Sequence, residues 1–420
     1  MKILHICAQD YGGAGTAARR LHLGLRSIGV ESKMLVLHRF SSDTDIVEFR
    51  EDNNFLMRQW KKCRRMLISS AFNSYRDTRP NGLEMFSDDR SVYDISKHTL
   101  VKEADIIHLH WIAGMVDYME FFPKVINKHI VWTLHDMNPF TGGCHYAGDC
   151  TKYRCNCHSC PQLGSASSND LSKRIWDRKE KCYKGKRIHV VTPSKWLEDC
   201  ARQSQLFRKF QADVIANGLS TYTFAEREKQ YSRELLGLPK DKILILFGAQ
   251  STTNARKGAS YLIKALMLLR NRVSNFNIGL MIFGGGPSTL LKDVEFSVYS
   301  LGTIRDELLL SVCYSAADMF ALPSLEDNFP NIVLESFACG TPVVGFDIGG
   351  IPDMVRPGET GLLAQTRNAE ELAEQIKWMI YHPKERKQMG SNARKVIEQE
   401  YTLEIQAKRY QKLYSSLSET

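Results

Sequence analysis

The sequence lacks a long hydrophobic run. No stretch of about eighteen apolar residues occurs in its 420 residues, so no membrane-spanning helix is predicted. The apolar run in the opening residues, MKILHICAQD, is also too short for the core of a signal peptide and leads into a glycine-rich loop. We therefore interpret these residues as the first strand of a cytoplasmic protein.

A strong compositional bias is missing as well. Apolar residues make up 43% and charged residues 25% of the chain, which are ordinary values for globular proteins. The length is sufficient for two domains. The formal net charge of +9 predicts an anionic partner, and nucleic acids, acidic lipid headgroups and nucleotide diphosphates all meet this condition. No nucleic-acid-binding motif is present, which disfavours the first of these.

Short apolar runs of the strand type recur along the whole chain and alternate with helical stretches. They cover residues 3–7, 34–37, 106–110, 130–134, 189–191, 243–247, 279–283, 319–322 and 343–346. This alternation predicts an α/β protein with parallel sheets flanked by helices. The glycines that follow the first run are typical of a phosphate-facing loop, although on their own they fit a plain tight turn equally well.

The most informative stretch is 323–352, which reads PSLEDNFPNIVLESFACGTPVVGFDIGGIP. It predicts a strand end, a polar loop, a helix that begins after Pro330 and ends at Gly340, and a second strand. The free amides at the start of such a helix form an anion site. Asp327 precedes the helix and Glu335 lies within it, and acids beside a phosphate site are expected to accept hydrogen bonds from hydroxyl groups.

This stretch resembles the signature of the retaining glycosyltransferases of family 4. The resemblance implies that Glu335 binds the ribose of a nucleotide-sugar and that Asp327 faces hydroxyl groups of the transferred sugar. The family usually has Glu at the first position, so Glu326 is an alternative to Asp327. The amides of Asn331 and Ile332 are then expected to face the donor phosphates. The competing interpretation is a helix cap followed by an ordinary surface glutamate.

The same resemblance implies the GT-B fold, with two doubly wound Rossmann-like domains that face each other across a cleft. The segment VIANGL at 214–219 is similar to the hinge that ends the first domain in this family. We therefore expect an N-terminal acceptor-side domain over residues 1–220, a C-terminal nucleotide-sugar-binding domain over 221–398, and a helix over 399–420 that crosses back to the first domain.

Further site residues follow from the resemblance. His135, after the strand in WTLHDMNPF, matches the histidine that contacts the transferred sugar near the reacting carbon, and a structural histidine is the alternative. Lys257 in NARKG matches the diphosphate-binding lysine, whereas the usual arginine is absent and Arg256 is its candidate substitute. A solvated surface position is the alternative for both cations. The glycine loops are expected to line the donor site through Gly13, Gly15 and Gly284.

Five of the eleven cysteines fall in one segment, GGCHYAGDCTKYRCNCHSC. Cys157 and Cys160 form a C-x-x-C knuckle, and two upstream thiolates complete a set that suits a closed structural zinc site. Free thiols and an iron–sulfur cluster are the alternatives. Some bacterial proteins that resemble this chain carry such an insertion, here 141–162, which implies the ligands Cys144, Cys150, Cys157 and Cys160 and leaves Cys155 as a spare.

Residues 55–72 form a basic amphipathic pattern. One helical face carries apolar side chains, namely Leu56, Trp60, Cys63 and Leu67, and another carries Arg58, Lys61, Lys62 and Arg65. A basic amphipathic helix with tryptophan is typical of an element that lies on an anionic membrane surface. The alternative is a helix packed on its own domain with a solvated basic side.

Taken with the resemblance, the residues predict a retaining glycosyltransferase that moves a sugar from a UDP- or GDP-sugar to a hydroxyl group. The resemblance implies a glycan or lipid-linked acceptor in bacterial capsule, exopolysaccharide or lipopolysaccharide synthesis, at the inner face of the cell membrane. Lys257 is expected to stabilise the leaving phosphate, so no catalytic metal is expected. A non-catalytic sugar-nucleotide-binding partner of an active glycosyltransferase is the competing class.

Overall fold

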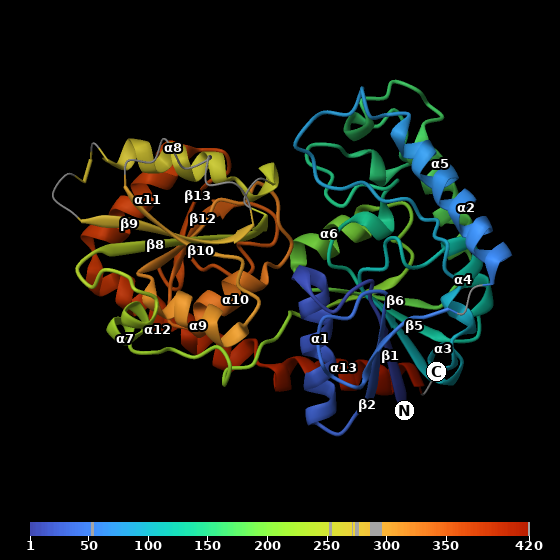
Figure 1. Cartoon of the computed structure of the whole chain (residues 1–420), viewed down its shortest axis with the longest axis horizontal. Helices are drawn as coiled ribbons and strands as arrows, with labels where there is room; N and C mark the ends of the chain where they lie inside the picture. The colour runs from blue at the N-terminus through green and yellow to red at the C-terminus, as the bar shows by residue number, and fades with distance from the viewer. Residues whose placement is uncertain (52–53, 252–253, 271, 274–276, 286–295, 419–420) are drawn as a thin grey trace. The chain divides into compact units, whose positions relative to one another are not determined.

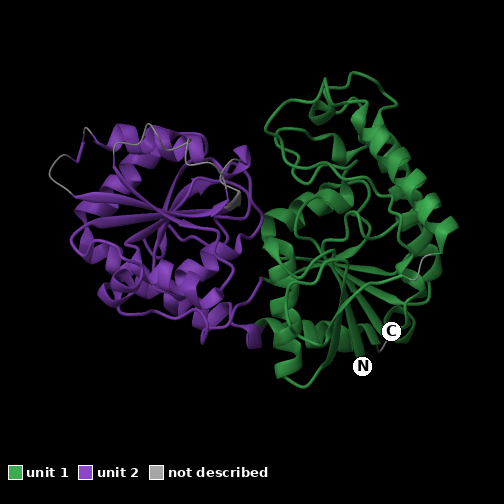
Figure 2. Ribbon diagram, viewed as in Figure 1, with its two compact units in different colours: residues 1–216, 406–420 green, residues 217–405 purple. Residues whose placement is uncertain are grey.

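The computed structural model divides the chain into two compact units (Figures 1 and 2). It describes all residues except 52–53, 252–253, 271, 274–276, 286–295 and 419–420. Unit 1 comprises residues 1–216 and 406–420, and unit 2 comprises residues 217–405. The described helices include none that is long and apolar enough to cross a membrane.

Unit 1 is built on a parallel sheet of seven strands in the order β3-β2-β1-β4-β5-β6-β7. The strands are β1 (Lys2–Ile6), β2 (Glu31–Val36), β3 (Ile46–Glu48), β4 (Ile106–Leu109), β5 (His129–Thr133), β6 (Ile188–Thr192) and β7 (Gln211–Val214). The central strand β4 is buried throughout, because helices cover both faces of the sheet. This burial explains its unbroken apolar character.

The two faces of this sheet have separate cores. On one face, α1 (Gly12–Ser27) and the end of α13 (Leu403–Ser418) pack on the sheet through residues such as Leu25 and Tyr414. The other face is covered mainly by α3 (Thr99–Glu103), α4 (Tyr118–Lys124), α5 (Leu171–Tyr183) and α6 (Lys195–Gln203). The remaining helix of unit 1 is α2 (Phe55–Asn73), and short 3-10 turns lie at Ile95–Lys97, Asn138–Phe140, Lys152–Arg154 and Pro161–Leu163.

Unit 2 repeats the plan with six parallel strands in the order β10-β9-β8-β11-β12-β13. They are β8 (Ile243–Ser251), β9 (Ile278–Gly285), β10 (Ser297–Gly302), β11 (Met319–Leu322), β12 (Val343–Asp347) and β13 (Gly361–Gln365). The helices are α7 (Lys229–Leu235), α8 (Ala259–Arg270), α9 (Glu307–Ala316), α10 (Asn331–Ala338), α11 (Ala369–Tyr381) and α12 (Pro383–Glu400), with a 3-10 turn at Ala255–Lys257. Both units are thus doubly wound α/β domains, which confirms the predicted fold class.

Candidate active site

The acidic loop between β11 and α10 holds a buried carboxylate. Asp327 is only 5% exposed, and its Oδ2 atom lies 2.6 Å from Lys257 Nζ and 3.3 Å from Arg256 Nη1. Ser324 donates a further hydrogen bond of 3.3 Å to the same oxygen. Burial alone would raise the pKa of Asp327, but the two cations outweigh it and lower that pKa. Three residues predicted for the site therefore meet at one ionised carboxylate.

Close backbone packing brings the cationic turn against the acidic loop. Gly258 follows Lys257 with φ 68°, and a Cβ atom there would lie 1.8 Å from the carbonyl oxygen of Pro323. The amide of Leu325 donates a 2.7 Å hydrogen bond to the carbonyl of Arg256. Only glycine allows this approach, so the K-G pair in the sequence is a requirement of the loop contact.

The G-G-I-P loop after β12 packs on the other side of the acidic loop. Gly349 has φ 60°, and a Cβ atom there would lie 2.1 Å from the carbonyl oxygen of Asp327. The amide of Gly350 donates to the same carbonyl at 3.0 Å. Three loops at the carboxyl ends of β8, β11 and β12 therefore fix the position of Asp327, at the edge where ligands bind in parallel α/β sheets.

Helix α10 carries the second predicted acid. Glu335 is 6% exposed and accepts a 3.1 Å hydrogen bond from the hydroxyl of Tyr314 on α9. Burial, followed by the charge of Glu335, raises the pKa of Tyr314 well above its ordinary value. Glu335 is therefore a buried, oriented carboxylate, unlike an ordinary surface glutamate. Its partner could not be predicted from the sequence, because Tyr314 belongs to a separate helix.

The first turn of α10 has no capping side chain, because Pro330 occupies the N-cap position. Asn331 and Ile332, the first two helical residues, follow it directly. The side chain of Asn331 accepts a 3.2 Å hydrogen bond from Asn217. Such a helix start retains the partial positive charge that favours an anion.

Two further residues of unit 2 were considered for the donor site, Gly284 and Glu326, and they have different structural roles. Gly284 is the penultimate residue of β9 and has φ 117°, and a Cβ atom there would meet the carbonyl oxygen of Ala249 at 1.7 Å, so the position requires glycine. Glu326 contributes its carbonyl group, which accepts a 2.7 Å hydrogen bond from Arg256. Of the two neighbouring acids, Asp327 is the one whose carboxylate meets both cations.

In unit 1, His135 follows β5 and is partly buried. Its Nε2 atom lies 3.0 Å from Nδ1 of His110. Burial lowers the pKa of His135 to about 4, against a smaller opposing effect of Asp136, so the ring is neutral at neutral pH. His110 was not predicted as a site residue. A signal for it exists in the sequence, because His108 and His110 are two residues apart along a strand and therefore lie on the same face of the sheet.

The glycine loop of unit 1 opens α1. A Cβ atom on Gly15 would lie 2.4 Å from the carbonyl oxygen of Gln9, so glycine is required there. A Cβ atom on Gly13 would meet no atom within 4 Å. The two predicted glycines therefore differ, because only Gly15 is fixed by packing.

The cysteine-rich segment also lies in unit 1. Cys144 is partly buried, and this burial raises the pKa of its thiol, with smaller contributions in the same direction from Cys157, Cys160 and Cys150. Cys155 is exposed and is not among these neighbours. The four predicted ligands are therefore grouped. Among the described residues, however, the set of three ligand atoms that lie within 4.8 Å of one another consists of His5, His108 and His110.

The sequence contains one Asp-x-Asp pair, a pattern that can hold a divalent cation. Asp43 and Asp45 form it, and both carboxylates pair with Arg26, at 3.0 and 2.9 Å. This pair lies in unit 1, and both of its carboxylates are engaged by one arginine. Lys257 and Arg256, the predicted cations of unit 2, do not take part in this cluster.

Helix α2 has an unusual orientation. Its apolar side chains are largely exposed, with Leu56 75%, Leu67 69% and Trp60 50% exposed, and Leu56 and Trp60 also line a cavity in unit 1. Its inward side carries Lys61, which pairs with Glu51, and Arg64, which donates to Asp117 at 2.6 Å. The expectation that Lys61 belongs to the exposed basic face is therefore wrong, because this pairing buries it. The expected apolar face exists, but it is exposed.

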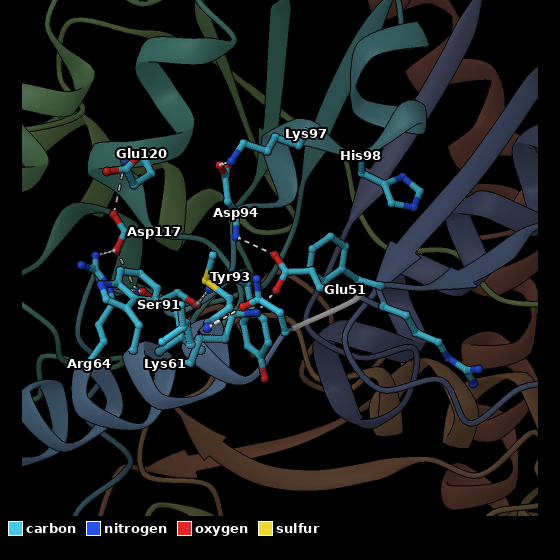
Figure 3. Close-up of a pocket in the computed structure, with 17 residues that line it drawn as sticks. Glu51, Lys61, Arg64, Ser91, Tyr93, Asp94, Lys97, His98, Asp117 and Glu120 are labelled. Carbon is cyan, nitrogen blue, oxygen red and sulfur yellow. Dashed lines mark hydrogen bonds and ion pairs between the residues drawn. The ribbon is translucent and has the colours of Figure 1, made fainter.

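A cavity of about 750 Å³ opens beneath α2 (Figure 3). Its wall combines aromatic and apolar groups, such as Phe49 and Tyr93, with the ion pairs that hold the helix. The amide of Asp94 donates to Glu51 at 3.4 Å across this wall. The cavity lies in unit 1, and neither Asp327 nor Lys257 contributes to it.

Comparison with known proteins places this geometry in context. Residues 241–382 match the family model described as glycosyl transferases group 1. The D-inositol 3-phosphate glycosyltransferase of Arthrobacter sp. (strain FB24) is 29% identical over 300 residues, which are 69% of this chain and 65% of that protein. Its namesake from Thermobifida fusca is 31% identical over 194 residues, 43% of this chain and 44% of that protein. The matches span less than two thirds of either relative.

Solved structures resemble the whole chain. Anabaena HepE, in complex with UDP and glucose, superposes with a TM-score of 0.69 and 16% identity, covering 99% of this chain and 100% of that one. Sucrose-phosphate synthase from Thermosynechococcus elongatus gives a TM-score of 0.66 and 19% identity, with 99% of both chains covered. At these identities the likeness shows the fold. The chain thus has the GT-B type of fold, carries a glycosyl transferases group 1 domain in residues 241–382, and is homologous to the D-inositol 3-phosphate glycosyltransferases.

Proposed function

We propose that the protein is a retaining glycosyltransferase that moves a sugar from a nucleotide-diphosphate donor to a hydroxyl group. The observation that carries this proposal is the buried carboxylate of Asp327 paired with Lys257 and Arg256, together with the buried carboxylate of Glu335 on α10, all inside the group 1 domain. A sugar nucleotide offers one complementary group to each of these side chains. Complexes of HepE with UDP-glucose support a UDP- or GDP-sugar as donor.

In this proposal each residue has one role. Glu335 accepts hydrogen bonds from the ribose hydroxyls, and Asp327 accepts them from hydroxyls of the transferred sugar. Lys257 and Arg256 contact the diphosphate, together with the amides that open α10 near Asn331 and Ile332. Lys257 donates a 2.6 Å hydrogen bond to Asp327, so in this proposal the donor phosphate and this carboxylate share the same cation.

The proposed reaction needs no catalytic metal. Breaking the bond between the sugar and the diphosphate leaves negative charge on the terminal phosphate, and preorganised cations stabilise that charge before it develops. Lys257 and Arg256 supply the positive charge that this stabilisation requires. The acceptor enters on the face that the phosphate leaves, the phosphate takes the acceptor proton, and the neutral His135 supports the charge-separated state. Retention of the anomeric configuration follows.

The test uses purified protein with UDP- and GDP-sugars. A matching donor should raise the melting temperature by linkage and should slowly release free sugar of the retained anomer, observed by NMR. Glu335→Ala should weaken nucleotide binding by on the order of 2 to 4 kcal/mol, because a charged acceptor is lost, whereas the exposed Glu385→Ala serves as the matched control. Unchanged nucleotide affinity in Glu335→Ala would remove the ribose assignment.

The competing class is a non-catalytic sugar-nucleotide-binding partner of an active glycosyltransferase. Such a protein would show the same thermal stabilisation but no release of sugar from the donor. Release that disappears at once in a chelator and returns with magnesium would instead contradict the metal-independent reaction.

We also propose the biological setting. The acceptor is a glycan or a lipid-linked glycan of bacterial surface polysaccharide synthesis, and the protein works on the inner face of the cell membrane. The exposed apolar side of α2, flanked by the exposed cations Arg58, Lys62 and Arg65, supports contact with an anionic membrane surface.

A structural zinc ion is the last part of the proposal. Cys144, Cys150, Cys157 and Cys160 fit it by their chemistry, because four thiolates leave no open coordination position for catalysis. The C-x-x-C spacing of Cys157 and Cys160 supports the assignment, as does the influence of Cys150, Cys157 and Cys160 on the pKa of Cys144, although no three of these sulfurs are among the described ligand atoms that lie within 4.8 Å of one another. Zinc bound there would link the ends of the 141–162 insertion and stabilise this loop-rich part of unit 1.

A further inference from the structure

A row of buried histidines leads from His135 into the core of unit 1. Nε2 of His135 lies 3.0 Å from Nδ1 of His110, and Nε2 of His110 lies 2.9 Å from Nδ1 of His5. His110 is 2% exposed and His5 is completely buried. The three residues come from β5, β4 and β1 or directly follow these strands, which are neighbours in the sheet. The row therefore spans adjacent strands behind the predicted sugar-contacting residue.

All three rings are neutral at neutral pH. Burial lowers the pKa of His135 to about 4 and lowers the pKa values of His110 and His5 well below their ordinary range. Each ring then carries one hydrogen, and each N···N contact needs one donor and one acceptor. The direction of donation is therefore the same at both contacts of the row, and the ring at the buried end gives one constraint on it.

The buried end favours one direction. Among the described residues, Nε2 of His5 has no hydrogen-bond partner. An unpaired buried N–H group is rarer in proteins than an unsatisfied acceptor, so this nitrogen carries the lone pair. Nδ1 of His5 then donates to His110, and Nδ1 of His110 donates to Nε2 of His135. The hydrogen of His135 is left on its own Nδ1 atom.

We propose that His110 and His5 are positioning residues that hold His135 in one ring orientation and in its Nδ1–H tautomer. This proposal rests on the sugar-contacting role proposed above for His135. With Nε2 occupied as an acceptor, His135 serves the reaction as a neutral hydrogen-bond donor through Nδ1. The hydrogen bond made by one ring nitrogen thus determines what the other nitrogen can do.

The same region contains the set of histidines whose geometry is nearest to a metal site. His5, His108 and His110 offer ligand atoms within 4.8 Å of one another. The nitrogens of His108, however, bond to the hydroxyls of Tyr414 and Thr133, each at 2.7 Å. Both nitrogens of His110 are also engaged in the row. A cation would have to replace these bonds, so the structure favours the hydrogen-bonded row.

The test reads the tautomer of His135 directly, from ¹⁵N shifts of the histidine rings in the full chain. His110→Phe keeps an aromatic ring but removes the partner of His135, and His135 should then show a mixture of tautomers. His5→Asp places an acceptor at the buried end, which should reverse the row and move the hydrogen of His135 to Nε2. His108→Phe is the matched control, because it removes two buried hydrogen bonds outside the row.

We expect the ¹⁵N signals of His135 to keep the Nδ1–H pattern in the wild type and in His108→Phe. Donor turnover should fall about 10- to 100-fold in His110→Phe, as is typical when the partner that orients a functional histidine is lost. If His108→Phe and His110→Phe change the His135 signals equally, the histidines have only a structural role and the proposal is wrong. An Nε2–H pattern in the wild type, or shifts of metal-bound nitrogen, would also overturn it.

The NMR result is independent of catalysis. If the protein transfers no sugar but the tautomers respond as expected, the proposed function fails and the positioning of His135 stands. If turnover occurs while the His135 tautomer ignores His110→Phe and His5→Asp, the positioning proposal fails alone. Should His5→Asp not fold, the comparison of His110→Phe with His108→Phe still decides.

Discussion

The two units share one architecture but keep their polar chemistry in different places. In unit 2, the predicted site residues are in loops at the ends of strands, and glycines hold these loops together. In unit 1, polar groups are placed inside the sheet, where histidines bond to one another and to Tyr414 of α13. Eleven of the twelve histidines belong to unit 1, and only His382 belongs to unit 2. The same fold therefore supports a loop-built site and a core-built one.

The largest expected difference between the two units is in their stability at acidic pH. Six histidines of unit 1 have lowered pKa values, namely His5, His22, His98, His108, His110 and His135. Unfolded histidine titrates near 6.5, so between that value and about 4 the unfolded chain binds more protons and stability falls as the pH falls. Each such histidine lowers the free energy of unfolding by up to about 1.4 kcal/mol for each pH unit within this range.

Hydrogen exchange at pH 7.5 and pH 5 measures this effect for each unit. Peptides of unit 1 should lose protection at the lower pH, whereas peptides of unit 2 should keep it. Asp327 and Asp318 of unit 2 have lowered pKa values, so the stability that they contribute is lost only below about pH 4. Earlier loss of protection in unit 2 would contradict the comparison.

Removing the central cation of unit 2 should affect turnover and leave the fold intact. Lys257→Met takes away a preorganised charge next to the developing phosphate, so turnover should fall on the order of a hundredfold. The exposed Lys264→Met on α8 is the matched control in the same unit. Equal activity of the two variants, measured with a saturating donor, would remove Lys257 from the mechanism.

The cysteine group should matter for unit 1 alone. Replacing Cys157 and Cys160 by Ser should release one zinc per chain and lower the melting temperature of unit 1, because thiolate ligands are lost. Cys155→Ser is the matched control, since Cys155 is exposed and lies outside the group. Elemental analysis of protein purified without added metal decides the matter, and an absence of zinc in the wild type would reject the site.

The sequence predicted the interior of both sheets and missed their edges. Every strand expected from an apolar run is present, whereas β3, β7, β10 and β13 were not expected. These four strands end the two sheets. An edge strand is covered less completely, and β7 and β10 are largely or partly exposed, so they lack the apolar runs by which interior strands are identified.

A similar division applies to the candidate site. The candidate residues Lys257, Asp327 and Glu335 could be proposed from the sequence because short motifs carry them. Their partners Tyr314 and His110 could not, because each contact depends on which helix or strand lies next in space. Helix α2 shows the same limit. Its periodicity indicated two faces, but only the fold shows that ion pairs hold the helix by its polar side.

The smallest effect per residue is expected for substitutions in helix α2, and the property affected is binding to lipid vesicles. Arg58, Lys62 and Arg65 are exposed beside the apolar side chains of α2, so each should contribute about 1 kcal/mol to binding of an anionic lipid surface. Their replacement by Gln should weaken co-sedimentation with vesicles that contain an anionic lipid. Lys61 is excluded from the set, because its pairing with Glu51 buries it.

The matched control removes the same charge from unit 2. Lys384, Lys387 and Lys395 are exposed on α12, which has no row of exposed large apolar side chains among its described residues, so their replacement by Gln should leave vesicle binding almost unchanged. If both triple variants bind equally weakly, attraction depends on net charge alone and α2 has no special role. If only the α2 triple variant binds vesicles more weakly, its basic side chains contribute specifically. If the double variant Leu56→Ser and Leu67→Ser also binds more weakly, and does so at high salt as well, the apolar side of the helix contributes too. Salt screens the basic flank but not the apolar one, so the two contributions can be measured separately.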